Sequence, residues 1–214
     1  MAAQPEGVPC WADAMFTDVE GAKAFYGDVL GWTFGEGSSE YGNYTQAYSD
    51  GTFGVWQAGK HEGFEKRGEP GAYAWAEVFT RAPEKSDAFF PAVFPYTVQR
   101  MEDDAIDFKV FNVGDDTVLG RMTMTDEFPP EIPPYIQVYF TVEDCDAAVS
   151  RATERGGELQ SGPMDSPFGR FAALTDPQGA AFAVIDMRTA KGEAEDVGCL
   201  RHRTGGPPAA YRRP

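Results

Sequence analysis

An internal repeat is the sequence feature that most restricts how this chain folds. Residues 7–34 align with residues 71–98 at a constant offset of 64 positions and without a gap. The identical pairs are Gly7/Gly71, Trp11/Trp75, Ala12/Ala76, Glu20/Glu84, Ala24/Ala88, Phe25/Phe89, Val29/Val93 and Thr33/Thr97. Self-similarity at a fixed period indicates a duplicated supersecondary unit.

Each copy predicts a strand, a helix and a meander of strands. Residues 9–17 mix β-forming and small residues, and Asp18 is a candidate cap for the helix that follows. The apolar positions of that helix are Ala22, Phe25, Tyr26, Val29 and Leu30, spaced as on one helix face, and Gly31 predicts its end. In the second copy Pro83 suits a helix start, whereas Pro91 predicts a kink or an early end. Apolar runs bounded by Gly and Asp turns predict the strands.

A third unit has the same pattern without close sequence identity. Residues 135–142 predict a strand, and Cys145, Ala148, Val149 and Ala152 form the apolar face of a helix that ends near Gly156. Three further strands follow, with a tight turn at residues 176–179. The predicted fold class is therefore α+β, with three repeated βαβββ modules at residues 8–59, 71–125 and 134–187.

The domain organisation follows from these modules. We expect a single module, or half-domain, at residues 1–60, a linker at 61–70, and a complete two-module domain at 71–187. Residues 188–214 lack apolar periodicity and predict a disordered tail. An odd number of modules leaves the first without a partner. We expect it to pair with its own copy in a homodimer, in preference to packing on the complete domain.

Charge and composition exclude several functions. The formal net charge is −16, and the tail carries +3, which leaves −19 on residues 1–187. Such an acidic body repels phosphate backbones and anionic membranes, so we expect no nucleic-acid and no membrane partner. The chain has no long apolar run and no signal-peptide pattern at its start, which predicts a cytoplasmic protein. Three distant cysteines without CxxC spacing argue against a disulfide framework or a structural zinc site.

Several segments resemble the vicinal oxygen chelate (VOC) superfamily of glyoxalases, bleomycin-resistance proteins and extradiol dioxygenases. The segments are GRFAALTDPQGAAFAVI at 169–185, FYGDVLGWTF at 25–34 and FTVEDCDAAVSRATERGG at 140–157. Residues 9–34 further resemble the tandem-domain, glyoxalase-like branch whose members are often called hydroxylases. The resemblance covers about residues 9–187 and implies the βαβββ fold, but the same scaffold carries many chemistries.

The resemblance also implies positions for a divalent metal, on the first and last strands of each module. These positions fall on Trp11, Trp75, Gln137 and Ala183. Only Gln137 has a ligating side chain, and a neutral amide alone does not hold a catalytic metal. The two histidines, His61 and His202, lie outside the modules. We therefore predict no metal and no other cofactor, because the residues at the family's positions do not support the divalent metal.

Glu77 is the candidate catalytic residue. It lies two positions after Trp75, so on a strand both side chains point to the same face. A carboxylate beside a large aromatic side chain acquires a raised pKa and can act as a general base. Glu77 is also a candidate accessory metal ligand together with Gln137. The structural alternative is a carboxylate that accepts a cross-strand hydrogen bond or faces water.

The aromatic residues predict a ligand cavity. The candidate ligand-binding residues are Trp75, Glu77, Gln137, Tyr139, Arg170 and Phe171, with Phe79 and Tyr135 on the same strands. Such a lining of apolar rings with a few polar groups is typical of small-molecule sites. Core packing is the alternative for each ring. Arg170 is a candidate clamp for an anionic ligand, or else a surface partner of Asp165 or Asp176.

Three functions are consistent with these residues. The first is a small-molecule binding or sequestering protein of the glyoxalase and bleomycin-resistance type, without the usual metal site, for which the acidic body favours a neutral or cationic aromatic ligand. The second is a glyoxalase-like lyase or a hydroxylase or dioxygenase-type enzyme with a reduced site that uses Glu77 and Gln137. The third is a degenerate structural or regulatory module with no ligand.

Overall fold

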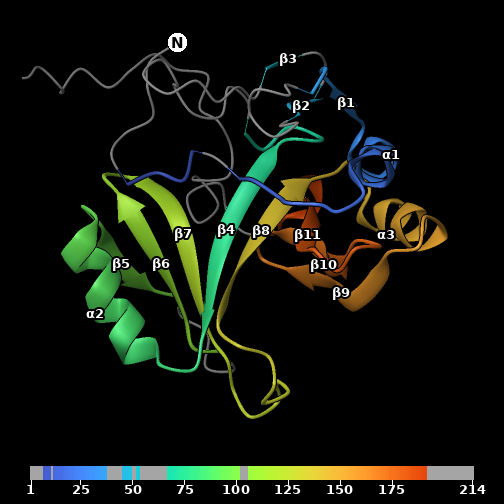
Figure 1. Cartoon of the computed structure of the whole chain (residues 1–214). Coiled ribbons are helices and arrows are strands. Elements are labelled where there is room, and N and C mark those ends of the chain that lie inside the picture. Colours follow the sequence, from blue (N-terminus) through green and yellow to red (C-terminus); the bar gives the residue numbers. More distant parts are fainter. Residues whose placement is uncertain are drawn as a thin grey trace, which may run out of the picture.

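The computed structural model describes residues 7–10, 12–37, 45–49, 52–53, 67–101 and 106–191. Within these residues one eight-stranded sheet forms the body, in the order β5-β6-β7-β4-β8-β11-β10-β9 (Figure 1). Its strands are β4 (Tyr73–Thr80), β5 (Thr97–Arg100), β6 (Phe108–Val113), β7 (Asp116–Thr123), β8 (Tyr135–Thr141), β9 (Glu158–Ser166), β10 (Gly169–Thr175) and β11 (Ala181–Asp186). The helices α2 (Pro83–Val93) and α3 (Cys145–Glu154) accompany the two halves of this sheet.

The second and third modules meet through their first strands. β4 and β8 are antiparallel neighbours at the centre of the sheet, and each is parallel to the last strand of its own module, β7 or β11. Glu77 is paired with Gln137, and Trp75 with Tyr139. Directly paired residues of antiparallel strands share a face, so the candidate residues of both modules point to the same side.

The first module contributes α1 (Val19–Leu30) and a separate sheet of β1 (Trp32–Phe34), β2 (Ala47–Ser49) and β3 (Thr52–Phe53). The predicted helix ends are confirmed. The Asp18 side chain accepts a hydrogen bond of 2.9 Å from the Gly21 amide, and Gly31 ends the helix with a φ of 71°. This positive φ suits a glycine because a Cβ would be strained there.

The predicted first strand of the first module is wrong for the residues that are described. Residues 12–17 form no strand, and Trp11 lies outside the described residues. The equivalent strand in the second module, β4, pairs on both sides. The first module has no partner module within the described chain to supply such neighbours, and a strand without a partner is not stable in water. The described residues therefore contain two complete βαβββ modules and part of a third.

Pro91 does not end α2 early, contrary to one of the two expectations for this residue. The helix continues to Val93, and the Phe94 amide still donates to the Phe90 carbonyl at 2.9 Å. Pro91 lies in the last turn, where its missing N–H removes only one intrahelical hydrogen bond. A proline near the end of a helix is tolerated for this reason.

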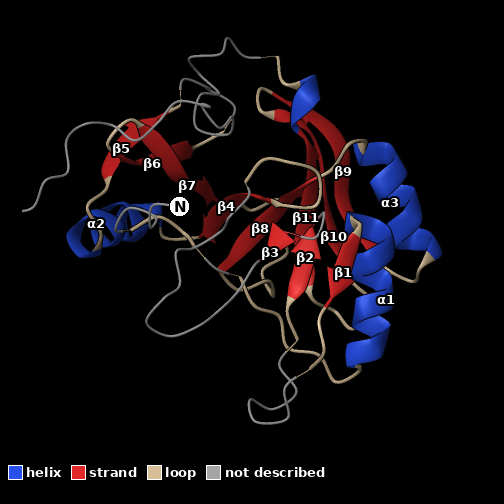
Figure 2. Cartoon of the chain, turned by 90° about the horizontal axis from the view of Figure 1, so that it is seen from above, coloured by secondary structure: helices blue, strands red, loops and turns tan. Residues whose placement is uncertain are grey.

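The first module packs on the outer face of the third. Figure 2 shows α1 beside α3, and side chains of α1 share a core cluster with α3, β10 and β11. Phe25 and Phe182 pack edge to face with ring centroids 6.0 Å apart. The Tyr26 hydroxyl donates to the buried Asp176 carboxylate at 3.0 Å. The first module thus packs on the complete domain, which was the second of the two arrangements expected for it. The homodimer stays a prediction.

Polar contacts fix the same interface. The Gln178 amide accepts a hydrogen bond from the Asp18 backbone N–H and donates one to the Asp18 carbonyl, each at 2.8 Å. Arg155, just after α3, forms an ion pair with Asp28 of α1 at 2.6 Å. Among the described helices, none combines the length and the apolar character needed to cross a membrane.

Candidate functional site

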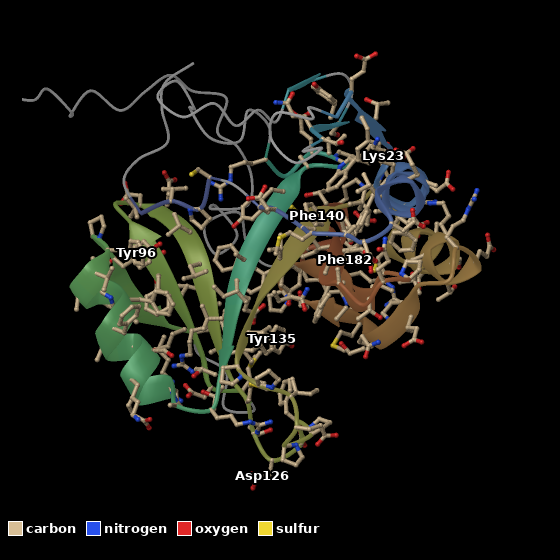
Figure 3. All side chains as sticks on the ribbon, in the orientation of Figure 1. Lys23, Tyr96, Asp126, Tyr135, Phe140 and Phe182 are labelled. Atoms are coloured by element: carbon tan, nitrogen blue, oxygen red, sulfur yellow. The ribbon has the colours of Figure 1, made fainter. Side chains whose placement is uncertain are left out.

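A cavity of about 920 Å³ lies between the two halves of the eight-stranded sheet. Side chains of β4 and β8 line it at the centre, those of β6 and β7 on one side, and those of β9 and β10 on the other. In Figure 3 Tyr135 lies between the two halves of the sheet, whereas Phe140 and Phe182 lie on the side of α1 and α3. The cavity and the core under the helices are therefore separate environments.

The structure brings together five of the six candidate ligand-binding residues. Trp75, Glu77, Gln137, Tyr139 and Phe171 all line the cavity. Phe79 and Tyr135 also line the cavity. Their rings are stacked, with centroids 4.7 Å apart and an interplanar angle of 2°. The period of two along β4 and β8 accounts for this, because alternate residues share a face.

Arg170 does not line the cavity. Phe171 and Ala173 on the same strand do, so Arg170 points to the opposite face. Its guanidinium forms ion pairs with Asp146 at 2.7 Å and with Asp165 at 3.0 Å. The hydrogen bonds from Arg170 lower the pKa of Asp146, and those from Lys191 and Arg170 lower the pKa of Asp165. The surface ion pair with Asp165 was the alternative interpretation of this residue.

Glu77 is the buried polar centre of the cavity. Glu77 is only 6% exposed, and the Tyr139 hydroxyl donates a hydrogen bond to its carboxylate. Burial raises the pKa of Glu77 from 4.5 to about 7, although the hydrogen bond from Tyr139 lowers it in part. Near neutral pH the carboxyl group therefore exists in both protonation states. Its negative charge in turn contributes to raising the pKa of Tyr135 and of Tyr139, beyond the effect of their burial.

Gly120 makes room for the Trp75 indole. A Cβ placed at position 120 would lie 3.0 Å from two atoms of the Trp75 ring and 2.9 Å from the Phe108 ring. Both rings line the cavity, so a side chain at this point of β7 would push them out of position. A glycine inside a strand often marks such a close approach, and this is the sequence signal by which Gly120 could have been found.

Aromatic rings from both modules surround the cavity. Phe108 approaches Phe168 with ring centroids 6.4 Å apart, and Tyr139 approaches Phe171 at 6.1 Å. Phe128 lies 5.9 Å from Phe79. Phe108, Phe128 and Phe168 all line the cavity and were not among the candidates, because they come from β6 and from loops whose position depends on the tertiary fold.

The described lining of the cavity is acidic. Its lining residues include Glu77, Asp107, Asp115, Glu127 and Asp165, and none of the lining residues that the structure describes is a lysine, arginine or histidine. Two of these acidic residues, Asp107 and Asp165, form ion pairs with cationic side chains that do not line the cavity. The fully buried Arg121 holds Asp107 at 2.9 Å, and Arg170 and Lys191 hold Asp165. The remaining field inside the cavity is negative, which disfavours anionic ligands.

The described side chains do not fit the divalent metal that the resemblance implies. Trp75 and Ala183, at two of the family's ligand positions, have no ligating atom, and Glu77 and Gln137 provide only two oxygen-bearing groups. Over the described ranges no three His, Cys, Asp or Glu side chains are arranged to hold a metal ion. A stable site for a divalent cation takes more ligands than two. The absence of a metal stays a prediction.

The chain resembles known proteins over much of its length. The model of the Glyoxalase/Bleomycin resistance protein/Dioxygenase superfamily matches residues 11–184. The anthracycline biosynthesis protein DnrV of Streptomyces peucetius is 36% identical over 136 residues, which are 64% of this chain and 49% of DnrV. The putative glyoxylase CFP32 of Mycobacterium tuberculosis is 41% identical over 135 residues, 62% of this chain and 50% of that protein. The chain thus spans about half the length of the curated relatives it matches.

Solved structures show weaker similarity. Methylmalonyl-CoA epimerase from Mycobacterium tuberculosis is 15% identical with a TM-score of 0.42, over 53% of this chain and 86% of that one. Homoprotocatechuate 2,3-dioxygenase from Brevibacterium fuscum is 20% identical with a TM-score of 0.40, over 55% of this chain and 36% of that one.

Proposed function

Because the chain belongs to the Glyoxalase/Bleomycin resistance protein/Dioxygenase superfamily, we propose that its cavity binds or sequesters a neutral or cationic aromatic small molecule, without the usual metal. One observation carries this proposal: a cavity of about 920 Å³ has aromatic walls from both modules around one buried carboxyl group. A volume of roughly 300–1,000 Å³ with few polar groups is typical of small-molecule sites.

The polar groups suit a ligand that donates hydrogen bonds. The ionised Glu77 carboxylate accepts a hydrogen bond from a ligand ammonium or hydroxyl group, and the Gln137 amide lies beside it on the next strand. The face of Trp75 offers a second attraction for a cation. DnrV is named for anthracycline biosynthesis, so anthracycline-type aromatics are the first ligands to test.

A glyoxalase-like enzyme is the second candidate function, and the state of Glu77 favours it. A carboxyl group whose pKa is raised to about 7 both accepts and returns a proton at neutral pH. In this function the Glu77 carboxylate removes a proton from a carbon acid or a hydroxyl group of the ligand. The protonated Glu77 then returns that proton to another position of the same molecule. CFP32, named a putative glyoxylase, is a relative consistent with this alternative.

An oxidative version of the enzyme, as in a hydroxylase or dioxygenase, needs groups that the described side chains do not supply. Glu77 and Gln137 alone provide proton transfer and hydrogen bonding, so we derive no oxidative step from them. A module with no ligand is the third alternative. We also propose that the protein is cytoplasmic and homodimeric and that it binds neither nucleic acid nor membranes. The net charge of −16 supports the last two points, because it repels anionic polymers and anionic surfaces.

Thermal unfolding of the full chain tests binding directly. A panel of anthracycline-type aromatics, other aromatic amines, neutral phenols and aromatic carboxylates is added in turn, and every class except the carboxylates should raise the melting temperature. Glu77→Gln should weaken the binding of the amines most, because it removes the negative charge that faces them. Asp146→Asn, which lies on the outer face, is the matched control and should leave binding unchanged.

Metal analysis of the same preparation separates the metal-free from the metal-bound alternative. Stoichiometric zinc, nickel, manganese or iron, lost in Glu77→Gln, would overturn the metal-free proposal. If no compound of the panel shifts the melting temperature, the ligand-free module is favoured instead. If the Glu77→Gln variant binds a compound but no longer converts it, the protein is an enzyme.

A further inference from the structure

The Gln137 side chain is buried in the wall of the cavity, and one end of its amide has no hydrogen-bond partner among the described residues. Gln137 is only 3% exposed and lines the cavity. Its Nε2 donates a long hydrogen bond of 3.4 Å to the backbone carbonyl of Val138, whereas no described group donates to its Oε1. Buried polar atoms in folded proteins nearly always have a partner, so this oxygen indicates a donor that enters the cavity.

The neighbouring Glu77 offers a second acceptor on the same face of the sheet. Glu77 and Gln137 are directly paired on β4 and β8, a position in which Cβ atoms lie about 5 Å apart. No hydrogen bond joins these two described side chains. The Val138 carbonyl is an acceptor, so it holds the NH2 end of the Gln137 amide and leaves the oxygen for another group. An ionised Glu77 also only accepts, so the two residues present two acceptors side by side.

Aromatic rings border this pair of acceptors on its other side. Gly120 on β7 is paired with Glu77 and has no side chain. The rings of Trp75 and Phe108 approach this position, to 3.0 Å and 2.9 Å from where a Cβ would lie. Both rings line the cavity, and aromatic rings attract cations. A positively charged group beside Glu77 therefore has aromatic rings as its neighbours.

Glu77 also differs from the other acidic residues of the described lining in having no cationic partner. Asp107 and Asp165 form ion pairs with cationic side chains, and Asp115 and Glu127 are exposed to solvent. Glu77 is buried, and no described cation pairs with it. A ligand cation therefore gains most at Glu77, because charges interact more strongly where water is excluded.

We propose that Glu77 and Gln137 together select protonated aromatic amines with at least two N–H donors, which are primary and secondary amines. One N–H donates to the Glu77 carboxylate, and a second donates to Gln137 Oε1. This inference rests on the proposed binding function and narrows its ligand class. A protonated tertiary amine has a single N–H and a quaternary amine has none, so each leaves at least one buried acceptor without a partner. An unpaired buried acceptor lowers the affinity.

A methylation series of one amine tests this selection. 2-Naphthylmethylamine and its N-methyl, N,N-dimethyl and N,N,N-trimethyl derivatives share a ring and a positive charge, but their N–H donors decrease from three to none. Isothermal titration calorimetry of the full chain at about pH 8, where Glu77 is ionised, measures their dissociation constants. The first two compounds should bind alike. The dissociation constant should rise by about tenfold at the dimethyl derivative and by about tenfold again at the trimethyl derivative.

Gln137→Met isolates the contribution of Gln137, because methionine has a similar length but no strong acceptor. In this variant the rise at the dimethyl derivative should disappear, since this compound still donates its one N–H to Glu77. The rise at the trimethyl derivative should remain. Gln160→Met is the matched control, because Gln160 is exposed on β9 and does not line the cavity. It should leave both rises unchanged, and circular dichroism checks that each variant is folded.

The position of the rise decides the result. If the amines bind the wild-type chain without a rise at the dimethyl derivative, or if that rise remains in Gln137→Met, selection by two acceptors is overturned while the binding function stands. The same holds if neutral phenols bind and none of the amines does. If no aromatic compound binds the wild-type chain, the binding function and the selection are both overturned.

Discussion

Replacing Glu77 with glutamine should make the folded chain more stable at about pH 8 and change it much less at about pH 5. Glu77 is buried, and its pKa rises from 4.5 to about 7 on folding. The folded chain therefore binds a proton more tightly than the unfolded chain does. Stability is highest when the carboxyl group is protonated, and it falls as the pH rises from about 4.5 through about 7.

The size of this effect follows from the same two pKa values. The difference between 4.5 and about 7 corresponds to about 3 kcal/mol once both states are ionised. Part of this loss is already present at about pH 5, so the expected fall between about pH 5 and about pH 8 is roughly 2–3 kcal/mol. A glutamine does not ionise, and it still accepts the hydrogen bond from Tyr139.

Urea unfolding of both chains at the two pH values measures this difference. The quantity of interest is the change with pH in the free energy of unfolding, compared between the wild-type chain and Glu77→Gln, because any effect of the substitution that is independent of pH cancels. Asp146→Asn is the control. The pKa of Asp146 is lowered from 3.8, so its titration lies below this range. Equal pH dependence in Glu77→Gln and the wild-type chain would refute the assignment of Glu77 as a desolvated carboxyl group.

Three further substitutions test the surroundings of Glu77. Tyr139→Phe removes the hydrogen bond that lowers the pKa of Glu77, so the fall in stability should move to higher pH in the same unfolding series. Gly120→Ala should raise the dissociation constants of aromatic ligands by about tenfold, because the added Cβ displaces Trp75, and fluorescence titration measures this change. Arg121→Met should lower the free energy of unfolding by about 3 kcal/mol, since it leaves two aspartates without their buried partner. A loss of under about 1 kcal/mol would contradict that role.

Local sequence patterns were sufficient to predict most of the eight-stranded domain. The cap at Asp18, the end at Gly31 and the period of two along residues 73–80 each depend on near neighbours only. The same period placed Trp75 and Glu77 on one face. The pairing of Glu77 with Gln137 and of Trp75 with Tyr139 also follows once the two modules join through their first strands.

Features that depend on distant partners were not predictable from one sequence. Residues 12–17 have a β-forming composition but no neighbouring strand, so the predicted strand is not formed. Arg170 was equally compatible with a ligand and with a surface ion pair, and only the position of Asp146 on α3 decides for the ion pair. Phe89 and Phe25 show the limit most clearly, because identical residues in a repeat acquire their burial from the elements that surround them.

Burial distinguishes Glu77 from the other acidic residues that line the described part of the cavity. Arg121, Arg170 and Lys191 all bind acidic side chains from outside the cavity, so they hold the charged rim in place without entering the site. Among the residues that the structure describes, no cation pairs with Glu77, and the hydrogen bond that lowers its pKa comes from the neutral Tyr139. Below about pH 7 the centre is a neutral acid that suits an uncharged ligand, and above it a carboxylate that suits a cation. We therefore propose that the burial of Glu77 sets the preference for neutral or cationic aromatic ligands, with the neutral ones favoured below about pH 7 and the cationic ones above it.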